Sequence, residues 1–308
     1  MKTTILLASL SLLPISHLSA QLGGDPTTPP SGTPTNTFRT LDQVEARIPL
    51  VEGAPGVSNT LFSGTGFTTI NGFFITSPGS YFLTENLDVP SGRALVITAN
   101  NVTLDLNGFV ISSQDETFSD PAIQISGATN VRISNGIISG NPEKVTASLG
   151  GNTVEPATGF SEAVKTSERI TGAGTLNMQT LTPDHVTITG LDCSLQATAG
   201  IDLSLATISN VKNCSVRNSQ GLGIVAQNVS SSFVVDCDAV GIEAETVNSC
   251  NAESSAASGI VASLVTNSVG KTTSATASHY GIDSDVASNS VAIGGANVTL
   301  QNTLAIDP

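Results

Sequence analysis

A short phrase that recurs between Gly200 and Gly281 constrains the fold of this chain more than any other feature. Five times a glycine precedes an aliphatic residue and a variable third residue, with intervals of 21, 20, 18 and 22 residues between glycines. A period near twenty residues is typical of solenoids. The framework of leucine-rich repeats is absent, so the repeat predicts a β-helix, in which one period is one coil of short strands. The copies are Gly200-Ile201-Asp202, Gly221-Leu222-Gly223, Gly241-Ile242-Glu243, Gly259-Ile260-Val261 and Gly281-Ile282-Asp283.

Strand-like segments begin well before this repeat. From Val102 to Ile111 apolar and polar residues alternate, which places one set toward a core and the other toward solvent. The pair Asn107-Gly108 supplies a bend that needs positive φ, and Asn135-Gly136 recurs in the same place one coil later. Asp105 points outward beside the bend and is predicted to support it. The repeat glycines are interpreted in the same way, as turn residues before an inward aliphatic side chain.

Three phrases carry a resemblance to a known class of proteins: TLDQVEARIPL, ITSPGSYFLTENL and NNVTLDLNGFVI. Over roughly residues 38–308 the chain resembles secreted bacterial proteins of the pectin-lyase-like fold class, most closely members of unknown activity. The resemblance implies an all-β, right-handed parallel β-helix and, by analogy alone, an extracellular glycan as ligand. It implies no activity by itself, because these phrases are structural.

The N-terminal region predicts export followed by a linker. Lys2, the apolar run Ile5–Ile15 and the small residues before Gln21 are typical of a secretory signal peptide. We expect a signal peptide at 1–20, a Pro/Thr/Gly-rich linker at 21–37 and the β-helix at 38–308. The protein is thus expected to be secreted, extracellular or on the cell surface, with the periplasm as an alternative. The apolar run is shorter than the roughly 20 residues that span a bilayer.

Two segments near the coils are expected to depart from the strand pattern. Thr40 is placed to cap a short helix that ends at Pro49 and covers the open first coil. Residues 141–180 break the coil rhythm and are predicted to leave the stack as a loop or hairpin. Insertions on one face of a solenoid commonly build its binding site, although tolerated surface elaboration is the favoured interpretation.

The charge of the chain excludes some partners. Its formal net charge is −14, with only 11 lysines and arginines. Nucleic-acid binding needs a basic face that replaces counterions, so no nucleic-acid partner is expected. Anionic membranes repel such a surface for the same reason, and no membrane span is predicted.

Four cysteines follow the predicted cleavage site. Cys193 and Cys214 are about one coil apart and are predicted to occupy stacked, equivalent positions. Export permits disulfides, but parallel side-chain vectors make a bridge between stacked coils awkward. Buried thiols that act as small apolar residues are therefore favoured, and the pairing of Cys237 and Cys250 is likewise left open.

The third position of the repeat offers the first set of candidate catalytic residues. Asp202, Glu243 and Asp283 occupy alternate coils, separated by Gly223 and Val261. Coils about 4.8 Å apart place neighbouring acids roughly 9–10 Å from each other. Inverting glycosidases separate their two carboxyl groups by about 6.5–9.5 Å, so the spacing is marginal. Solvated carboxylates on an outward face are the favoured interpretation.

A second candidate set combines one acid with two bases. A polysaccharide lyase needs a Lys or Arg near carboxylates, and Asp192, Lys212 and Arg217 are predicted to form such a patch. The alternative is an ordinary surface ion pair, worth about 0–1 kcal/mol.

Calcium is the one cofactor that the sequence brings into consideration. Asp236 and Asp238 flank Cys237 and would project from the same side of a strand. Calcium takes six to eight oxygen ligands, so two carboxylates are a thin basis for a site. Casual or absent calcium binding is favoured.

These observations support two functional hypotheses and a third possibility. The first is an exported β-helix that serves as a binding or structural module, with extracellular polysaccharide as its ligand. The alternative is a polysaccharide lyase or glycoside hydrolase that uses carboxylates on the outer face of the coils. The third is a scaffold that assembles through open solenoid ends. The sequence leaves open whether the chain is an enzyme.

Overall fold

The computed structural model describes residues 47–58, 70–115, 120–141, 159–171, 179–276, 278–294 and 300–301. All of them belong to one compact unit, Ala46–Pro308, while the other unit, Met1–Glu45, lies outside the described residues. The predicted signal peptide and linker, and most of the predicted capping helix, therefore lie outside them as well.

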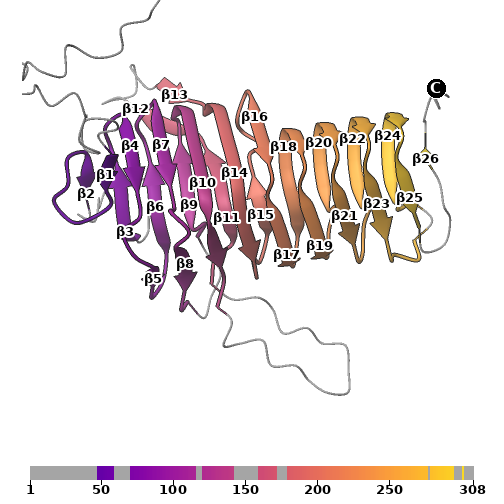
Figure 1. Ribbon diagram of the computed structural model, residues 1–308, viewed down its shortest axis with the longest axis horizontal. Helices are drawn as coiled ribbons and strands as arrows, with labels where there is room; N and C mark the ends of the chain where they lie inside the picture. The colour runs from indigo at the N-terminus through magenta and orange to yellow at the C-terminus, as the bar shows by residue number, and fades with distance from the viewer. Residues whose placement is uncertain are drawn as a thin grey trace, which may run out of the picture. The chain divides into compact units, whose positions relative to one another are not determined.

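Every regular element of the described residues is a β-strand, so this part of the chain offers no helix that could cross a membrane. A continuous sheet of 24 strands winds through successive coils, which stack in chain order (Figure 1). Strands of neighbouring coils pair in parallel, as between β10 (Thr129–Ser139) and β14 (Asp184–Ser194). The chain is thus a parallel β-helix, and the fold class that the repeat predicted is confirmed.

Each coil contributes to three parallel ladders. The first ladder comprises β3 (Ile70–Ile75), β6 (Arg93–Ile97), β9 (Ile123–Ser126), β11 (Glu162–Ser167), β15 (Ala199–Asp202), the leading parts of β18 (Leu222–Ser230), β20 (Ile242–Asn248), β22 (Ile260–Thr266) and β24 (Ile282–Ser288), and β26 (Leu300–Gln301). The second comprises β1 (Arg47–Pro49), β4 (Gly79–Phe82), β7 (Val102–Asp105), the leading parts of β10 and β14, β16 (Ser209–Lys212), and the trailing parts of β18, β20, β22 and β24. The third comprises β5 (Leu87–Val89), β8 (Val110–Ser113), the trailing parts of β10 and β14, β17 (Ser215–Ser219), β19 (Phe233–Cys237), β21 (Asn251–Ser254), β23 (Val269–Thr272) and β25 (Val291–Ile293).

Stacked aliphatic side chains form the core between the ladders. On the second ladder each inward residue lies over its counterpart in the next coil, and the whole column is buried. Burying one such side chain contributes about 1.5–3 kcal/mol relative to leaving it exposed. The column runs through Leu104, Ile133, Ile188, Val211, Val229, Val247 and Val265.

The repeat glycines are required by close packing as well as by turns, since Gly221, Gly241, Gly259 and Gly281 lie in bends directly before a strand. None of them has a positive φ. A Cβ on Gly223 would lie 2.4 Å from Cγ1 of Val234, which belongs to the third ladder of the same coil, and 2.2 Å from the carbonyl oxygen of Gly241. A Cβ on Gly200 would likewise lie 2.4 Å from Cγ1 of Val216. In the coils of the repeat the first and third ladders therefore approach each other so closely that no side chain fits at the glycine position.

The predicted register of the second repeat copy is wrong by two residues. Ile201 pairs with Ile224, and Ile224 pairs with Ile242. The structural copy is therefore Gly223-Ile224-Val225, because Leu222 pairs two residues earlier on the strand, with Ala199. Both phrases begin with glycine and an aliphatic residue, so composition alone does not distinguish them.

Turns between the second and third ladders use asparagine in the left-handed region. Asn107 has a φ of 55°, and Asn135 in the next coil has a φ of 58°. Asparagine tolerates this region better than most residues. The backbone N–H of Asn107 donates to Oδ1 of Asp105 at 2.8 Å, and Nη2 of Arg47 lies 2.6 Å from Oδ2 of Asp105. The prediction that Asp105 supports this turn is confirmed.

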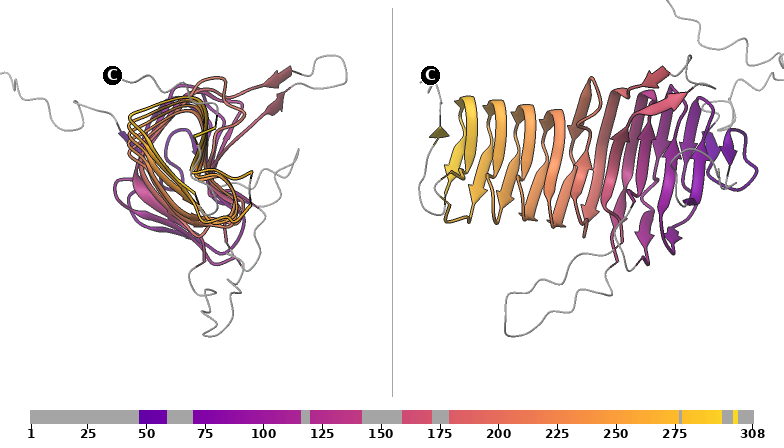
Figure 2. Two further views of the ribbon diagram at one scale, coloured as in Figure 1. Left: turned by 90° about the vertical axis from the view of Figure 1, so that its right-hand side faces the viewer. Right: turned by 180° about the vertical axis from the view of Figure 1, so that it is seen from behind.

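The segment 141–180 only partly leaves the stack. β11 pairs with β9 and β15 in the first ladder, so a full rung lies in the middle of the expected excursion. After it, β12 (Arg169–Thr171) and β13 (Gln179–Leu181) form an antiparallel hairpin that projects from the coils (Figure 2). Val164 of β11 is fully buried between Ile123 and Ile201 of the neighbouring coils and supplies the inward side chain that the stack needs.

The start of the described chain corrects the predicted capping helix. Arg47–Pro49 form strand β1, which pairs in parallel with β4, although these residues were expected to end the helix. Ile48 precedes a proline, and this position disfavours the helical conformation. Nearby, the short strand β2 (Val57–Ser58) pairs antiparallel with β3.

All four cysteines are free and buried, which agrees with their expected role as small apolar residues. Their predicted stacking is wrong. Cys193 lies over Val216 on the third ladder, whereas Cys214 precedes that ladder, at the turn. The backbone N–H of Cys214 donates to Oγ of Ser232, 3.2 Å away in the next coil. Burial raises the pKa of the Cys237 thiol to about 12.

Candidate functional site

An outward-facing column on the first ladder carries the three acids that the repeat singled out. Each member pairs with the next one along the stack. Asp202, Glu243 and Asp283 do occupy alternate coils, but Val225 rather than Gly223 separates the first two. The column runs through Phe74, Val96, Gln124, Lys165, Asp202, Val225, Glu243, Val261, Asp283 and Gln301.

The character of this column changes along the stack. Phe74 and Val96 are only 4% and 0% exposed although they face outward, and they form a small apolar cluster apart from the main core. Nζ of Lys165 lies 2.5 Å from Oε1 of the buried Glu162. From Lys165 to Asp283 the column is half-exposed or exposed. The surface of the column that is open to solvent therefore begins at Lys165, whose charge is paired with Glu162.

Two hollows lie along this open part of the column. Their volumes are about 330 and 300 Å³, and they share Glu243 and Ala244. We call the continuous depression the furrow. The first hollow is lined by Leu203, Ser204, Ala206, Ser209, Val225, Ala226, Gln227, Glu243, Ala244 and Glu245. The second is lined by Glu243, Ala244, Val261, Ala262, Ser263, Asp283, Ser284 and Asp285.

Four carboxylates give the furrow its charge. Glu243 and Glu245 come from β20, and Asp283 and Asp285 come from β24, two coils further on. None of the four makes an ion pair within the described part of the chain, and the lining contains no described lysine, arginine or histidine. The furrow is therefore an acidic surface without internal counter-charges.

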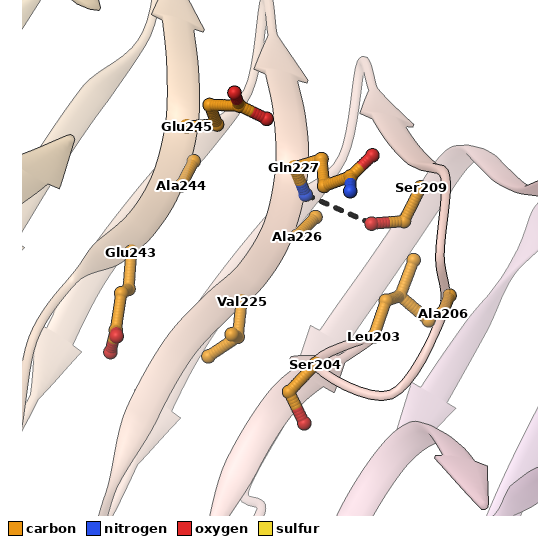
Figure 3. Close-up of a pocket in the computed structure, with 10 residues that line it drawn as sticks. All are labelled: Leu203, Ser204, Ala206, Ser209, Val225, Ala226, Gln227, Glu243, Ala244 and Glu245. Carbon is orange, nitrogen blue, oxygen red and sulfur yellow. Dashed lines mark hydrogen bonds between the residues drawn. The ribbon is translucent and has the colours of Figure 1, made fainter. Parts of the chain in front are cut away.

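The loop between β15 and β16 bounds the first hollow. Its residue Ser204 contributes an exposed hydroxyl, whereas Ser209 is fully buried and its Oγ accepts a hydrogen bond from the N–H of Gln227 at 2.8 Å (Figure 3). In the same view the side chains of Glu243 and Glu245 point away from each other. These two carboxylates are thus arranged to meet different parts of a ligand rather than a single atom.

Small residues occupy the strand position between the two acids of each pair. Ala226, Ala244, Ala262 and Ser284 lie over one another in successive coils. Ser284 is only 4% exposed, and its Oγ has no hydrogen-bond partner in the described part of the chain. Most buried polar groups in proteins are hydrogen-bonded. Ala226 and Ala262 of the same column belong to the hydrophobic core, so the Ser284 hydroxyl faces the core rather than the neighbouring carboxylates.

The structure brings only part of the predicted acid set together. Glu243 and Asp283 line the furrow, but Asp202 does not, and its Oδ1 accepts a hydrogen bond from the N–H of Ser204 at 3.0 Å. Sequence reasoning missed Glu245, Asp285 and Ser284. The signal was present as an acid-x-acid pattern in two repeat copies, Glu243 to Glu245 and Asp283 to Asp285.

The predicted patch of Asp192, Lys212 and Arg217 is not assembled. Asp192 pairs with Ser215 on the third ladder, whereas Lys212 pairs with Thr189 on the second. No ion pair joins Asp192 to either base in the described residues, and Nε of Arg217 donates to Oγ of Ser215 at 3.2 Å. The left-handed turn at Asn213 separates the two ladders. Lys212 and Arg217 are close in sequence but therefore lie on different faces of the β-helix.

Asp236 and Asp238 flank the buried Cys237 and are both exposed, as expected. Neither lines the furrow, and Oδ1 of Asp238 accepts a hydrogen bond from Ser255 at 2.8 Å. Within the described residues no group of three or more His, Cys, Asp or Glu side chains is arranged to hold a metal ion. Calcium binding at this pair remains a prediction without structural support.

A buried ionic cluster lies on the first ladder outside the furrow. Nη2 of Arg93 lies 2.5 Å from Oδ1 of Asp120, and both side chains are almost fully buried. Burial lowers the pKa of the Arg93 guanidinium, against the attraction of Asp120 and Glu162. With Lys165, which pairs with Glu162, this cluster balances its own charges, and it joins β6 to the chain near β9, which indicates a structural role.

Comparison with solved structures finds distant similarities. No family model and no curated protein matches the chain. The A-module of mannuronan C-5 epimerase AlgE4 from Azotobacter vinelandii aligns with a TM-score of 0.41 at 11% identity, over 73% of this chain and 72% of that one. An alginate lyase from Paenibacillus sp. str. FPU-7 aligns with a TM-score of 0.35 at 14% identity, over 77% and 89%. A pectin methylesterase in complex with a hexasaccharide aligns with a TM-score of 0.30 at 14% identity, over 80% and 74%.

Proposed function

We propose that this chain is a non-catalytic binding module that holds an extended polysaccharide along the furrow. The observation that carries the proposal is the continuity of the two hollows, which share Glu243 and Ala244 and cross successive coils. Carboxylates and the exposed hydroxyls of Ser204 and Ser263 line it, and these groups are suited to hydrogen bonds with sugar hydroxyls.

The direction of the furrow favours a glycan over a peptide. It runs across the strands, whose backbone N–H and C=O groups bond to the neighbouring coils, as Ile242 bonds to Gly259 and Ile260 to Gly281. An extended peptide needs partners for its own backbone groups. The furrow supplies side-chain groups only, and a polysaccharide carries its polar groups as hydroxyls around each ring.

The geometry argues against the hydrolase alternative. Glu243 and Glu245 point apart (Figure 3), and Glu243 and Asp283 are two coils apart, or roughly 9–10 Å. Inverting enzymes hold their carboxyl groups about 6.5–9.5 Å apart and retaining enzymes about 5–5.5 Å, so this spacing lies at the upper limit for inversion and well beyond that for retention. A lyase needs a base near its carboxylates, and the described lining contains no lysine or arginine.

The signal-like N-terminus supports the same proposal. Export would bring the module into contact with extracellular polysaccharide, whether in the medium or on a cell surface. Secretion of the full-length chain, followed by N-terminal sequencing of the released protein, tests this part. A mature protein that begins at Gln21 supports it, and retention of an uncleaved chain in the cytosol contradicts it.

Titration calorimetry with neutral, amino and acidic oligosaccharides tests the binding. We expect binding without release of unsaturated or reducing-end products, and loss of binding in the Glu243→Gln/Asp283→Asn double variant. The Asp236→Asn/Asp238→Asn variant is the matched control, because it removes two exposed carboxylates outside the furrow. Products that disappear in the furrow variant would show that the chain is an enzyme and would overturn the proposal.

A further inference from the structure

The outward face of the third ladder changes character over β19, β21, β23 and β25. These strands pair in parallel, with one register irregularity between Val234 and Cys237, so their outward side chains lie in two adjacent columns (Figure 1). Three of these side chains are large, apolar and exposed, with Phe233 at 39%, Val291 at 54% and Ile293 at 43%. We call this surface the flank. It consists of Phe233, Val235, Asn251, Glu253, Val269, Lys271, Val291 and Ile293.

The preceding coils present polar side chains at the same positions of the ladder. Asp192 and Ser215 precede Phe233 in the first column, and Arg217 precedes Val235 in the second. The apolar surface is therefore bounded by polar side chains, which is typical of a contact site for another molecule.

The middle of the flank carries two opposite charges. Nζ of Lys271 lies 2.6 Å from Oε1 of Glu253 on the neighbouring coil. The coils of this ion pair lie between the apolar residues of β19 on one side and those of β25 on the other. The order along the second column is apolar, acidic, basic and apolar, from Val235 through Glu253 and Lys271 to Ile293. The two charges thus lie at equal distances from the midpoint of the flank.

We propose that the flank is the contact surface between two copies of this chain that lie side by side in opposite directions. A two-fold interface uses the same patch on both copies, so the patch has to be complementary to itself. A two-fold axis parallel to the strands, between β21 and β23, meets this condition. Phe233 then faces Val291 of the second copy, and Glu253 faces Lys271 of the second copy. Each carboxylate lies between two ammonium groups, and each ammonium group lies between two carboxylates.

Charge complementarity favours this arrangement over a dimer of parallel chains. A two-fold axis along the stack would place Glu253 opposite Asn251 and Lys271 opposite Val269, so both charges would lose water without an opposite charge across the interface. Such desolvation is costly. The flank shares no residue with the furrow, so the dimer leaves both furrows open and its formation does not depend on glycan binding.

The size of the flank predicts a transient dimer. The flank extends about 14 Å from β19 to β25, and its two columns lie about 7 Å apart. This contact is well below the roughly 800 Å² per partner that stable complexes bury. We therefore expect an equilibrium between monomer and dimer at high protein concentration.

Sedimentation equilibrium of the full chain tests the proposal at concentrations up to about 1 mM, where an association of that strength is detected. Val291→Asp should weaken dimer formation about tenfold or more, because it places an unmatched charge against Phe233. Leu264→Asp is the matched control. Leu264 is 40% exposed but belongs to the second ladder, and this variant adds the same charge to the chain. It should leave the association unchanged.

A second experiment exchanges the two charges of the flank. The Glu253→Lys/Lys271→Glu variant keeps an ion pair within the chain and opposite charges between two of its own copies. We expect it to fold, as circular dichroism would show, and to self-associate as the wild type does. A mixture with the wild type places like charges against each other, so mixed dimers should form about tenfold less readily. Sedimentation of the fluorescently labelled variant with unlabelled wild type measures them.

Each outcome bears on the proposal. A monomer at every concentration overturns it. Equal weakening by Leu264→Asp overturns it as well, because the association would then not use the flank. Mixed dimers that form as readily as the unmixed ones would show that Glu253 and Lys271 do not face each other between copies, and would overturn the antiparallel arrangement. Weakening by Val291→Asp alone, together with selective pairing of like forms, supports the proposal.

Discussion

Replacement of Ser284 by alanine should make the protein more stable. A buried hydroxyl without a partner loses its bonds to water on folding, at a cost of about 1–3 kcal/mol. The three preceding coils place Ala226, Ala244 and Ala262 at the same position, so the local packing already accepts alanine. We therefore expect Ser284→Ala to raise the free energy of unfolding by about 1 kcal/mol, near the lower end of that range. In a domain of this size this corresponds to a rise in Tm of about 2–4 °C.

Urea unfolding followed by circular dichroism measures this change as a shift of the midpoint at constant slope. The matched control is Ser254→Ala. Ser254 is equally buried, but its Oγ donates to the carbonyl of Ala239 at 2.6 Å and accepts from the N–H of Ala257 at 2.9 Å. Its removal should lower stability by about 1–3 kcal/mol. If Ser284→Ala destabilises the protein as much as Ser254→Ala does, the hydroxyl of Ser284 has a partner and the reasoning is refuted.

Three further predictions address the fold. Gly223→Ala should lower the unfolding free energy by about 3 kcal/mol, because the new Cβ would lie 2.2 Å from the carbonyl oxygen of Gly241; an unchanged urea midpoint would contradict this. Iodoacetamide at pH 8 should leave Cys237 unmodified in the native protein, because burial raises the pKa of its thiol to about 12. The same reagent should label Cys237 in urea. Mass spectrometry that finds Cys237 labelled in the native protein would contradict this. Asp105→Ala should lower the free energy of unfolding by about 1 kcal/mol, because it removes the ion pair with Arg47 and the hydrogen bond from Asn107. If this decrease is the same at high salt, the ion pair does not contribute to it.

The solenoid could be predicted from the sequence because each coil must meet the same packing requirement. The first and third ladders approach too closely for a side chain, and an inward aliphatic residue must follow. Glycine and isoleucine therefore recur with the period of the coil, as at Gly241-Ile242 and Gly259-Ile260. The register of the second repeat copy was harder to predict, because Leu222 is as apolar as Ile224. Which of them lies over Ile201 is decided by contacts with the neighbouring coil, not by local composition.

The candidate site was predictable only in part. Glu243 and Asp283 share a position in the repeat, so their common face follows from periodicity. The contribution of Glu245 and Asp285 follows only when the strand continues from the first ladder into the second, as β20 and β24 do. The separation of Lys212 from Arg217 depends on the left-handed turn at Asn213. Counting residues along the sequence does not show that the chain changes direction there.

The glycine contacts between neighbouring coils have a consequence for how such a chain can change its length. A Cβ on Gly241 would lie 2.6 Å from the carbonyl oxygen of Gly259, so each coil leaves the space that the next one fills. The natural unit of insertion is thus one entire coil, such as the 18 residues from Gly241 to the residue before Gly259. Duplicating that unit would extend the furrow by about 4.8 Å and place a second pair of glutamates directly over the first. The chain is therefore expected to lengthen by whole coils, and each added coil moves the acidic pairs by one coil spacing.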